Sequence, residues 1–191
     1  MLNSIFEKDI EECLSVLKQK GIILYPTDTI WGIGCDATNE EAVNKIITRK
    51  KRPEQKSFVV LVAAEKDILQ YTASPDLAIF DYLQAINKPT TVIYQHALGL
   101  AENVINEDGS VAIRICQDEF CRHLIRRFRK PIVSTSANIS GEPSPRNYSE
   151  ISPAIKQGVD YVVNYRQDDN NLHTPSSIIR WKDGKAEIIR P

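Results

Sequence analysis

Three polar segments, far apart in the sequence, hold most of the residues that could carry chemistry. The first, YPTDTIWGIGCDA at residues 25–37, brings hydroxyl groups and a carboxylate together behind a proline. Its glycines, Gly32 and Gly34, allow a backbone or a ligand to approach closely. Taken alone, the segment is equally consistent with a turn in which Asp28 and Thr29 bond to local backbone groups. It becomes informative together with partners elsewhere in the chain.

The second segment, RKKRPEQKS at residues 49–57, places five cations within eight residues, where a helix is expected to end at Pro53. Cations at a helix C-terminus interact favourably with the helix dipole, so a solvated helix end would explain them. Alternatively, Lys50, Arg52 and Lys56 grip a triphosphate and a substrate carboxylate, because arginine presents a planar fork and lysine a mobile point charge. Both interpretations remain open at this point.

The third segment, STSANISGEPSP at residues 134–145, follows an apolar strand with a dense set of hydroxyls and one amide. Short polar side chains at a strand end suit phosphate oxygens and a ribose, although such loops are also common as plain turns. Further cations stand near strand ends at Arg114 and Arg190, and Ser176 and Ser177 open the last predicted hairpin. These residues predict a binding site if the fold brings them together.

Composition excludes several classes of protein. Lys and Arg number 24 and Asp and Glu number 25 in 191 residues, so any contact with a polyanion must come from a local patch. Residues 1–17 mix charged and apolar residues, which is unlike a signal peptide or membrane span, and we expect a cytoplasmic protein. We also expect reduced thiols without a zinc site, because CxxC pairs and clustered histidines are absent from the sequence among Cys13, Cys35, Cys116, Cys121, His96, His123 and His173.

The apolar periodicity predicts strands and helices that interleave along one domain, residues 1–191. Predicted strands lie at residues 22–25, 57–62, 90–94, 110–115, 131–135, 176–181 and 186–190. Four helices are predicted. Two follow capping boxes at Ser4–Glu7 and Thr38–Glu41, a third spans residues 76–86, and a fourth carries Phe120, Leu124, Ile125 and Phe128 on one face. Residues 141–148 read as a long surface loop, and Asp183-Gly184 as a hairpin turn. The pattern favours an α/β or α+β fold with one twisted sheet of mixed parallel and antiparallel strands and flanking helices.

Together the segments resemble the YrdC family, the threonylcarbamoyl-AMP synthases. The specific feature is the order across residues 22–190: YPTDTIWGIGCDA, a Lys-x-Arg-Pro pattern from Lys50, SVAIRI, STSAN followed by SG, SPR, and PSSI. The resemblance implies a YrdC-like fold with a concave basic face that holds ATP and L-threonine. It also implies the reaction of threonine, bicarbonate and ATP to threonylcarbamoyl-AMP and pyrophosphate, a nucleotidyl transfer used for threonylcarbamoyladenosine modification of tRNA.

The resemblance assigns roles by motif position. Lys50 and Arg52 would be catalytic. The threonine would contact Thr29, Arg52, Arg114, Ser134 and Ser176. The ATP would lie among Lys50, Arg52, Lys56, Ser110, Ser136, Asn138, Ser144 and Arg190. Mg²⁺ would enter with the ATP, with no metal ligand assigned among the side chains. A monomer is expected, with downstream tRNA threonylcarbamoyl-transfer proteins as partners, together with a contact to tRNA or double-stranded RNA.

Two alternatives remain. Residues 86–94 lack the WPGP-like segment of many members, Cys116 replaces a common proline, and Leu61 stands where many members have a histidine. Because of Leu61, the first alternative is a related carbamoyl-adenylating enzyme that uses a different amine, or carbamoyl phosphate. The second alternative is a nucleic-acid-binding module without synthase activity. It is motivated by the run RHLIRRFRK at residues 122–130, together with the cations of residues 49–52. An amphipathic helix with its cations facing outward also explains that run, and we favour this interpretation.

Overall fold

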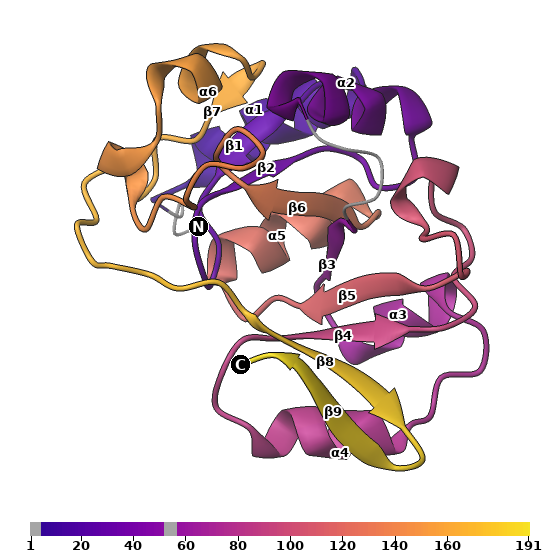
Figure 1. Cartoon of the computed structure of the whole chain (residues 1–191). Helices are drawn as coiled ribbons and strands as arrows, with labels where there is room; N and C mark the ends of the chain where they lie inside the picture. Colours follow the sequence, from indigo (N-terminus) through magenta and orange to yellow (C-terminus); the bar gives the residue numbers. More distant parts are fainter. Residues whose placement is uncertain (1–4, 52–56) are drawn as a thin grey trace.

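The strands form one nine-stranded sheet, in the order β7-β1-β2-β6-β3-β5-β4-β8-β9 (Figure 1). The computed structural model describes residues 5–51 and 57–191. Its strands are β1 (Ile23–Tyr25), β2 (Gly32–Gly34), β3 (Val59–Val62), β4 (Thr90–Tyr94), β5 (Val111–Ile115), β6 (Ile132–Ser136), β7 (Tyr161–Val162), β8 (Ser177–Lys182) and β9 (Lys185–Arg190). Its helices are α1 (Glu7–Lys18), α2 (Glu40–Lys50), α3 (Glu65–Tyr71), α4 (Ala78–Ala85), α5 (Glu119–Phe128) and α6 (Pro153–Gln157), with short 3₁₀ turns at Glu102–Val104 and Tyr148–Glu150.

The sheet is mixed, as the sequence predicts. β3 pairs with β5, β4 with β8, and β1 with β7 in parallel, whereas the other neighbouring strands are antiparallel. The predicted hairpin between β8 and β9 is confirmed, because Asp183 and Gly184 take the positive φ angles of 51° and 72° that such a turn requires. This hairpin forms the edge of the sheet near the C-terminus (Figure 1).

Several predicted boundaries need correction. The second helix is capped by Asn39 rather than Thr38: the Asn39 side chain accepts from the Ala42 amide at 2.9 Å, while the Thr38 hydroxyl donates to Asp36 Oδ1 at 2.6 Å. The helix predicted at residues 76–86 is shorter in the structure and forms α4. Asp76 lies before its first turn, where Oδ1 accepts a hydrogen bond from the amide of Ala78, the first helical residue. Ser4 lies outside the described residues. Four elements, β2, α3, α6 and β7, were not predicted from the sequence. Of these, β2 is hard to foresee because two of its three residues are glycines.

Residues 122–128 of the run RHLIRRFRK belong to the amphipathic helix α5, which begins at Glu119. Its predicted apolar residues, Phe120, Leu124, Ile125 and Phe128, are buried. The helix packs against α1 and β3. Ion pairs with Glu7 and Asp36 engage two cations of the run, Arg127 and Lys130. The helix interpretation of this run is therefore confirmed.

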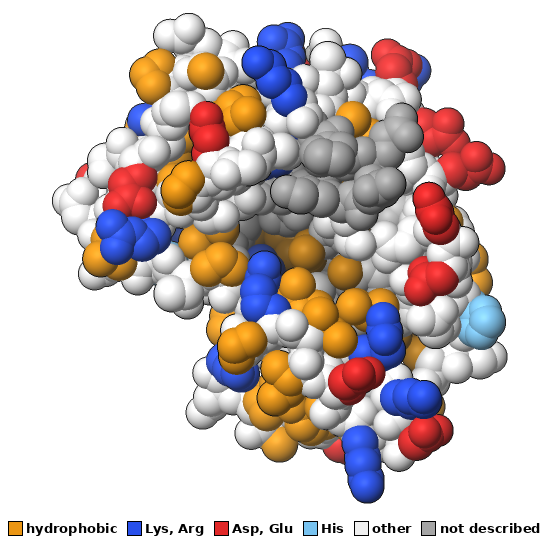
Figure 2. All heavy atoms as spheres, in the orientation of Figure 1, with side chains coloured by type: hydrophobic (Ala, Val, Ile, Leu, Met, Phe, Trp, Pro, Cys, Tyr) orange, Lys and Arg blue, Asp and Glu red, His pale blue; other side chains and the backbone are white. Residues whose placement is uncertain are grey.

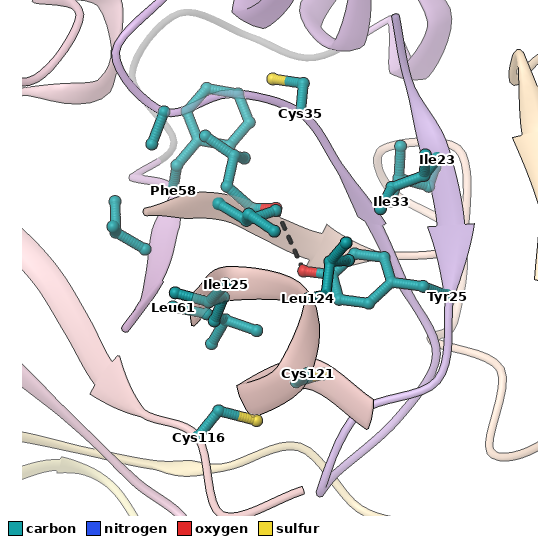
Figure 3. Packing of buried hydrophobic residues seen from close by; sticks show 14 of the residues in the cluster. Ile23, Tyr25, Ile33, Cys35, Phe58, Leu61, Cys116, Cys121, Leu124 and Ile125 are labelled. Atoms are coloured by element: carbon teal, nitrogen blue, oxygen red, sulfur yellow. Dashed lines mark hydrogen bonds between the residues drawn. The ribbon is translucent and has the colours of Figure 1, made fainter. Parts of the chain in front are cut away.

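The hydrophobic core lies between the sheet and its helices, and it fixes the strands that bear the polar segments. Figure 3 shows Tyr25 at its centre, where the phenol donates a hydrogen bond to the Val133 carbonyl at 3.2 Å. All four cysteines are free thiols buried in this core, and burial raises the pKa of Cys13 and Cys35 far above the usual range. Among the described residues, no helix has the length and apolarity that crossing a bilayer requires.

Asp9 fastens α1 to the segment that follows β7. Its carboxylate accepts hydrogen bonds from the Tyr161 hydroxyl at 2.6 Å, the Asn164 amide at 3.0 Å and the Tyr165 amide at 2.9 Å. Burial alone would raise the pKa of Asp9, but these hydrogen bonds outweigh it and hold the pKa below its usual value. The folded state therefore favours the ionised carboxylate.

We expect Asp9→Asn to lower the free energy of unfolding at pH 7 by about 1–3 kcal/mol, since partly buried hydrogen bonds lose a charged acceptor. Because folding lowers this pKa, the stabilisation is present above the unfolded pKa of about 4 and is lost as the pH falls through the folded value. Urea unfolding of both proteins from pH 7 to pH 3 should show the difference shrinking in acid. Glu11→Gln, an exposed change on the same helix, is the control. A constant difference across this range would contradict the role given to Asp9.

Candidate functional site

A cavity of about 210 Å³ lies where the three polar segments meet. The molecular face that contains it is hollowed across its middle, with apolar and Lys or Arg side chains at the edge (Figure 2). Seven of the candidate residues line the cavity: Thr29, Arg114, Ser134, Ser136, Ser144, Ser176 and Arg190. These residues come from both halves of the sheet and from the loops that join them, so the fold gathers positions up to 161 residues apart, counting from Thr29 to Arg190.

Two guanidinium groups, from Arg114 and Arg190, give the cavity its charge. Arg114 is buried on β5, and its Nη2 lies 3.0 Å from Asp28 Oδ1. The other carboxylate oxygen of Asp28 accepts from the Gln117 amide at 3.0 Å. Burial and then the positive charge of Arg114 lower the pKa of Arg190. Because the two positive charges repel each other, an anion bound between the guanidinium groups would be stabilised by both.

Arg190 is held against the start of β8. Its Nε and Nη2 donate to the Ser176 carbonyl at 3.1 Å and 2.7 Å. The Ser176 hydroxyl lies 2.8 Å from the Thr91 hydroxyl on β4. These bonds fix the last strand of the sheet to the cavity wall, so Arg190 is positioned before any ligand binds.

Thr29 presents a hydrogen-bond acceptor to the cavity. The Thr27 hydroxyl donates its one proton to the Ile30 carbonyl at 2.9 Å and lies 3.0 Å from the Thr29 hydroxyl. Thr29 must therefore donate to Thr27, which leaves the lone pairs of Thr29 Oγ1 available. Such an oxygen suits the ammonium or amine group of a ligand.

Gly32 is one of the residues that line the cavity. It pairs with Ser136 across the β2–β6 ladder, and a β-carbon at this position would lie 2.8 Å from the Ser134 hydroxyl oxygen. A larger residue would push into the serine that the sequence assigns to the ligand. The glycine expected to permit close approach therefore permits it between two strands of the sheet.

Lys50 lies behind the cavity rather than in its lining. Its side chain is buried at the end of α2, and its ammonium group donates to the carbonyls of Ser136 and Asn138. The Asn138 side chain accepts from the Ser136 hydroxyl and donates to the Glu142 carbonyl. Lys50 and Asn138 therefore shape the turn that presents Ser136.

Ser110 lies in a neighbouring cavity of about 480 Å³, and Ser57 lines both cavities. The Ser110 hydroxyl donates to Asp108 Oδ1 at 2.6 Å and accepts from the Asn106 amide at 3.0 Å. Asn106 in turn accepts from the Ser57 hydroxyl at 2.7 Å, which links the two cavities. The remaining candidates, Arg52 and Lys56, lie outside the described residues.

Several lining residues were not predicted from the sequence. The apolar wall includes Trp31, Val59 and Ile178. Trp31 packs on Tyr148 with ring centroids 4.9 Å apart, and it stands inside the first polar segment, where its motif could have indicated it. Val59 and Ile178 look like ordinary strand residues, and the sheet register alone brings them to the cavity.

A match to a protein-family model shows which family this chain belongs to. The model of the Sua5/YciO/YrdC family, described as telomere recombination, matches residues 15–191. The chain belongs to the Sua5/YciO/YrdC family. The resemblance to YrdC proteins seen in the sequence is thereby confirmed, and it extends over both cavities described above.

Two relatives of this Sua5/YciO/YrdC protein match it over nearly the whole chain. The threonylcarbamoyl-AMP synthase of Xanthomonas euvesicatoria is 33% identical over 186 residues, covering 95% of this chain and 97% of the relative. That of Psychromonas ingrahamii is 30% identical over 189 residues, covering 97% and 98%. The structure of Sua5 from P. abyssi complexed with L-threonine superposes with a TM-score of 0.85 at 21% identity. That match covers 96% of this chain and 54% of the Sua5 chain, so this chain spans about half of that protein.

Proposed function

We propose that this protein is an L-threonylcarbamoyladenylate synthase, a nucleotidyltransferase that condenses L-threonine, bicarbonate or CO₂, and ATP. The observation that carries the proposal is the convergence of Arg114 and Arg190 with five of the predicted hydroxyl-bearing side chains on one cavity. Threonylcarbamoyl-AMP is then the product, and it serves the threonylcarbamoyladenosine modification of tRNA. The names of the full-length relatives support the same activity.

The threonine occupies the part of the cavity between Arg114 and Thr29. Arg114 is preorganised by Asp28, and a guanidinium fork matches a carboxylate in charge and geometry. The oxygen of Thr29 accepts a hydrogen bond from an N–H of the neutral amine, which orients the nitrogen so that its lone pair can attack carbon. Ser134 and Ser176 are close enough to the same space to contact the substrate hydroxyl, since both line it.

The nucleotide extends from this cavity into its neighbour. A volume of about 210 Å³ is below the roughly 300–1,000 Å³ of typical ligand pockets, so ATP needs the adjoining 480 Å³ cavity as well. Ser136, Ser144 and Arg190 lie on one side of this path and Ser110 on the other. Lys50 supports the Ser136 turn, and the sequence motif places Arg52 and Lys56 with the phosphates.

The chemistry needs positioning and charge rather than a nucleophile from the protein. The threonine nitrogen attacks the carbon of CO₂ and loses a proton to form N-carboxythreonine; from bicarbonate the same product forms with release of water. A carboxylate oxygen of that species attacks the α-phosphorus of MgATP, and the bond to the β-phosphate oxygen breaks and releases pyrophosphate. The guanidiniums of Arg114 and Arg190 would hold the two anionic reactants together and offset the charge on the moving oxygens. Magnesium enters with the nucleotide as part of the substrate.

The direct test is release of pyrophosphate from radiolabelled ATP, with product mass determined in the same reaction. We expect release that requires both threonine and bicarbonate, together with the mass of threonylcarbamoyl-AMP. ATP hydrolysis that is independent of threonine would contradict the proposal. Omission of each substrate in turn supplies the controls.

Thr29→Val should weaken threonine binding about tenfold while ATP binding changes little, because one hydrogen bond to the amine contributes roughly 1–1.5 kcal/mol. Valine keeps the shape of threonine and removes its hydroxyl. Calorimetric titration of each ligand measures the two affinities separately. Thr135→Val, which changes a neighbouring lining residue without an assigned threonine contact, is the matched control. An equal loss for both ligands in Thr29→Val would assign Thr29 to the scaffold.

The position of Leu61 motivates an alternative amine substrate. Leu61 lies beside Arg114 in the β3–β5 register and is fully buried, so it offers no polar contact at this point. A screen of amino acids by thermal shift with ATP present tests the specificity, because a ligand that binds the native state raises its melting temperature. The largest shift with threonine, and a smaller one with serine, supports the proposal. A flat response to threonine favours a carbamoyl-adenylating enzyme that uses a different amine.

A further inference from the structure

A second, separate cavity lies at the opposite end of the β3–β6 strand pair. Its volume is about 590 Å³, and it opens between α3, the end of α5 and residues 129–131. Val59 and Ser134 are register partners and line the first cavity, whereas Val62 and Pro131 line the second. Three residues of strand, roughly 10 Å, separate the two sets. The two cavities share no lining residue among those described.

The rim of the second cavity carries net positive charge. Lys66, Arg126 and Arg129 are exposed, and in the described part of the chain none of them has an ion-pair partner. A fourth cation, Lys130, is paired with Asp36 at 2.6 Å. The three unpaired cations come from two helices and a helix end, so the tertiary fold brings them to one place.

The remaining walls mix apolar and polar side chains, among them Gln70 and Tyr71, and the carboxylate of Asp67 is already engaged. Asp67 Oδ2 accepts from the amides of Ala63 and Ala64 at 3.0 Å and 2.9 Å, so its charge is partly satisfied by backbone donors. Val62 and Ile125 supply apolar surface. A cavity of ligand size with apolar patches and several unpaired cations has the composition of a nucleotide site: the apolar patches contact a base, and the cations hold phosphate oxygens.

We propose that this second cavity binds a nucleotide through its phosphate groups, independently of the ATP that reacts in the first cavity. Arg126 and Arg129 are the principal phosphate ligands, and Lys66 is a third cation on the opposite rim. The same chemistry is offered by a free nucleoside polyphosphate and by a nucleotide within an RNA chain. Both sources are compared in the test.

The test variant is Arg126→Gln with Arg129→Asn. Glutamine preserves helix propensity inside α5. Asparagine is chosen at 129 because this C-cap residue has φ of 60°, a left-handed conformation that asparagine tolerates. The matched control, Lys182→Gln with Lys185→Gln, removes the same charge from two exposed positions at the β8–β9 turn.

Equilibrium dialysis with radiolabelled ADP counts the nucleotide sites of each protein. We expect the cavity variant to lose one site relative to wild type, and the control to keep them all. This difference is independent of the proposed synthase activity: if ADP did not bind in the first cavity, the wild-type count would fall by one but the loss in the cavity variant would remain. Synthase turnover at saturating substrate should be unchanged in the cavity variant.

A 5′-phosphorylated, single-stranded RNA decamer provides the second arm. If RNA affinity falls at least tenfold in the cavity variant while ADP sites are unchanged, the nucleotide is part of a chain. The slope of log affinity against log salt should then become shallower by about 1.4, as expected for two lost phosphate contacts. Unchanged binding of both ADP and RNA, or an equal loss in the control, would overturn the proposal.

Discussion

Arg114→Ala is expected to reduce kcat/KM for threonine by at least about 100-fold, because it removes a charge-assisted, two-pronged contact worth roughly 3 kcal/mol. It should also lower the free energy of unfolding by about 3–5 kcal/mol, since the Asp28 carboxylate, with its side chain 9% exposed, would lose its ion-pair partner. Steady-state kinetics and urea unfolding measure the two effects separately.

A second change separates binding from folding. Asp28→Asn, introduced into the Arg114→Ala protein, removes the uncompensated charge, so it should recover part of the lost stability. It cannot restore the guanidinium, so turnover should stay low. If turnover recovers with stability, Arg114 acts as a scaffold residue and the threonine carboxylate binds elsewhere.

Gly34→Ala is expected to destabilise the protein by about 3 kcal/mol or more. A β-carbon at this position would lie 2.5 Å from the Val133 carbonyl oxygen and 2.6 Å from Tyr25 Cε1. Both neighbours belong to the core, and the carbonyl is backbone, so the strands β2 and β6 would have to separate. Urea unfolding at constant pH gives the change in the free energy of unfolding.

Gly109→Ala is the control for Gly34→Ala. Nothing lies within 4 Å of its added β-carbon, and its φ of 75° alone carries a cost of about 1 kcal/mol. The difference between the two variants isolates the close approach of the strands from backbone strain. A Gly34→Ala protein no less stable than Gly109→Ala would contradict the tight β2–β6 contact.

The elements that could be predicted from the sequence are those whose signals are local. The β8–β9 hairpin follows from Asp183-Gly184, and the buried face of α5 follows from apolar spacing. β2 was missed because a strand of Gly-Ile-Gly is stabilised by its neighbours β1 and β6 rather than by its own propensity. Asn39 was missed as a cap because Thr38 is an equally good candidate until Asp36 engages its hydroxyl.

In the candidate site, too, some residues could be predicted from local motifs, whereas contacts between distant segments could not. Thr29, Ser134 and Ser176 stand in recognisable motifs, and the register of the sheet brings them to the cavity. The sequence could not show that Lys50 turns its ammonium toward the Ser136 and Asn138 carbonyls, because that contact joins residues 86 and 88 positions apart. Likewise, the ion pair of Asp28 with Arg114 depends on how β5 meets the first loop.

A crystal structure with threonine and a non-reactive MgATP analogue most directly tests the claim that both reactants share the hollow between Arg114 and Arg190. We predict the threonine carboxylate at the Arg114 guanidinium and the nucleotide phosphates near Ser136 and Arg190, with the nucleotide reaching toward Ser110. Threonine or the nucleotide bound at saturation on another surface, with this hollow empty, would contradict the account.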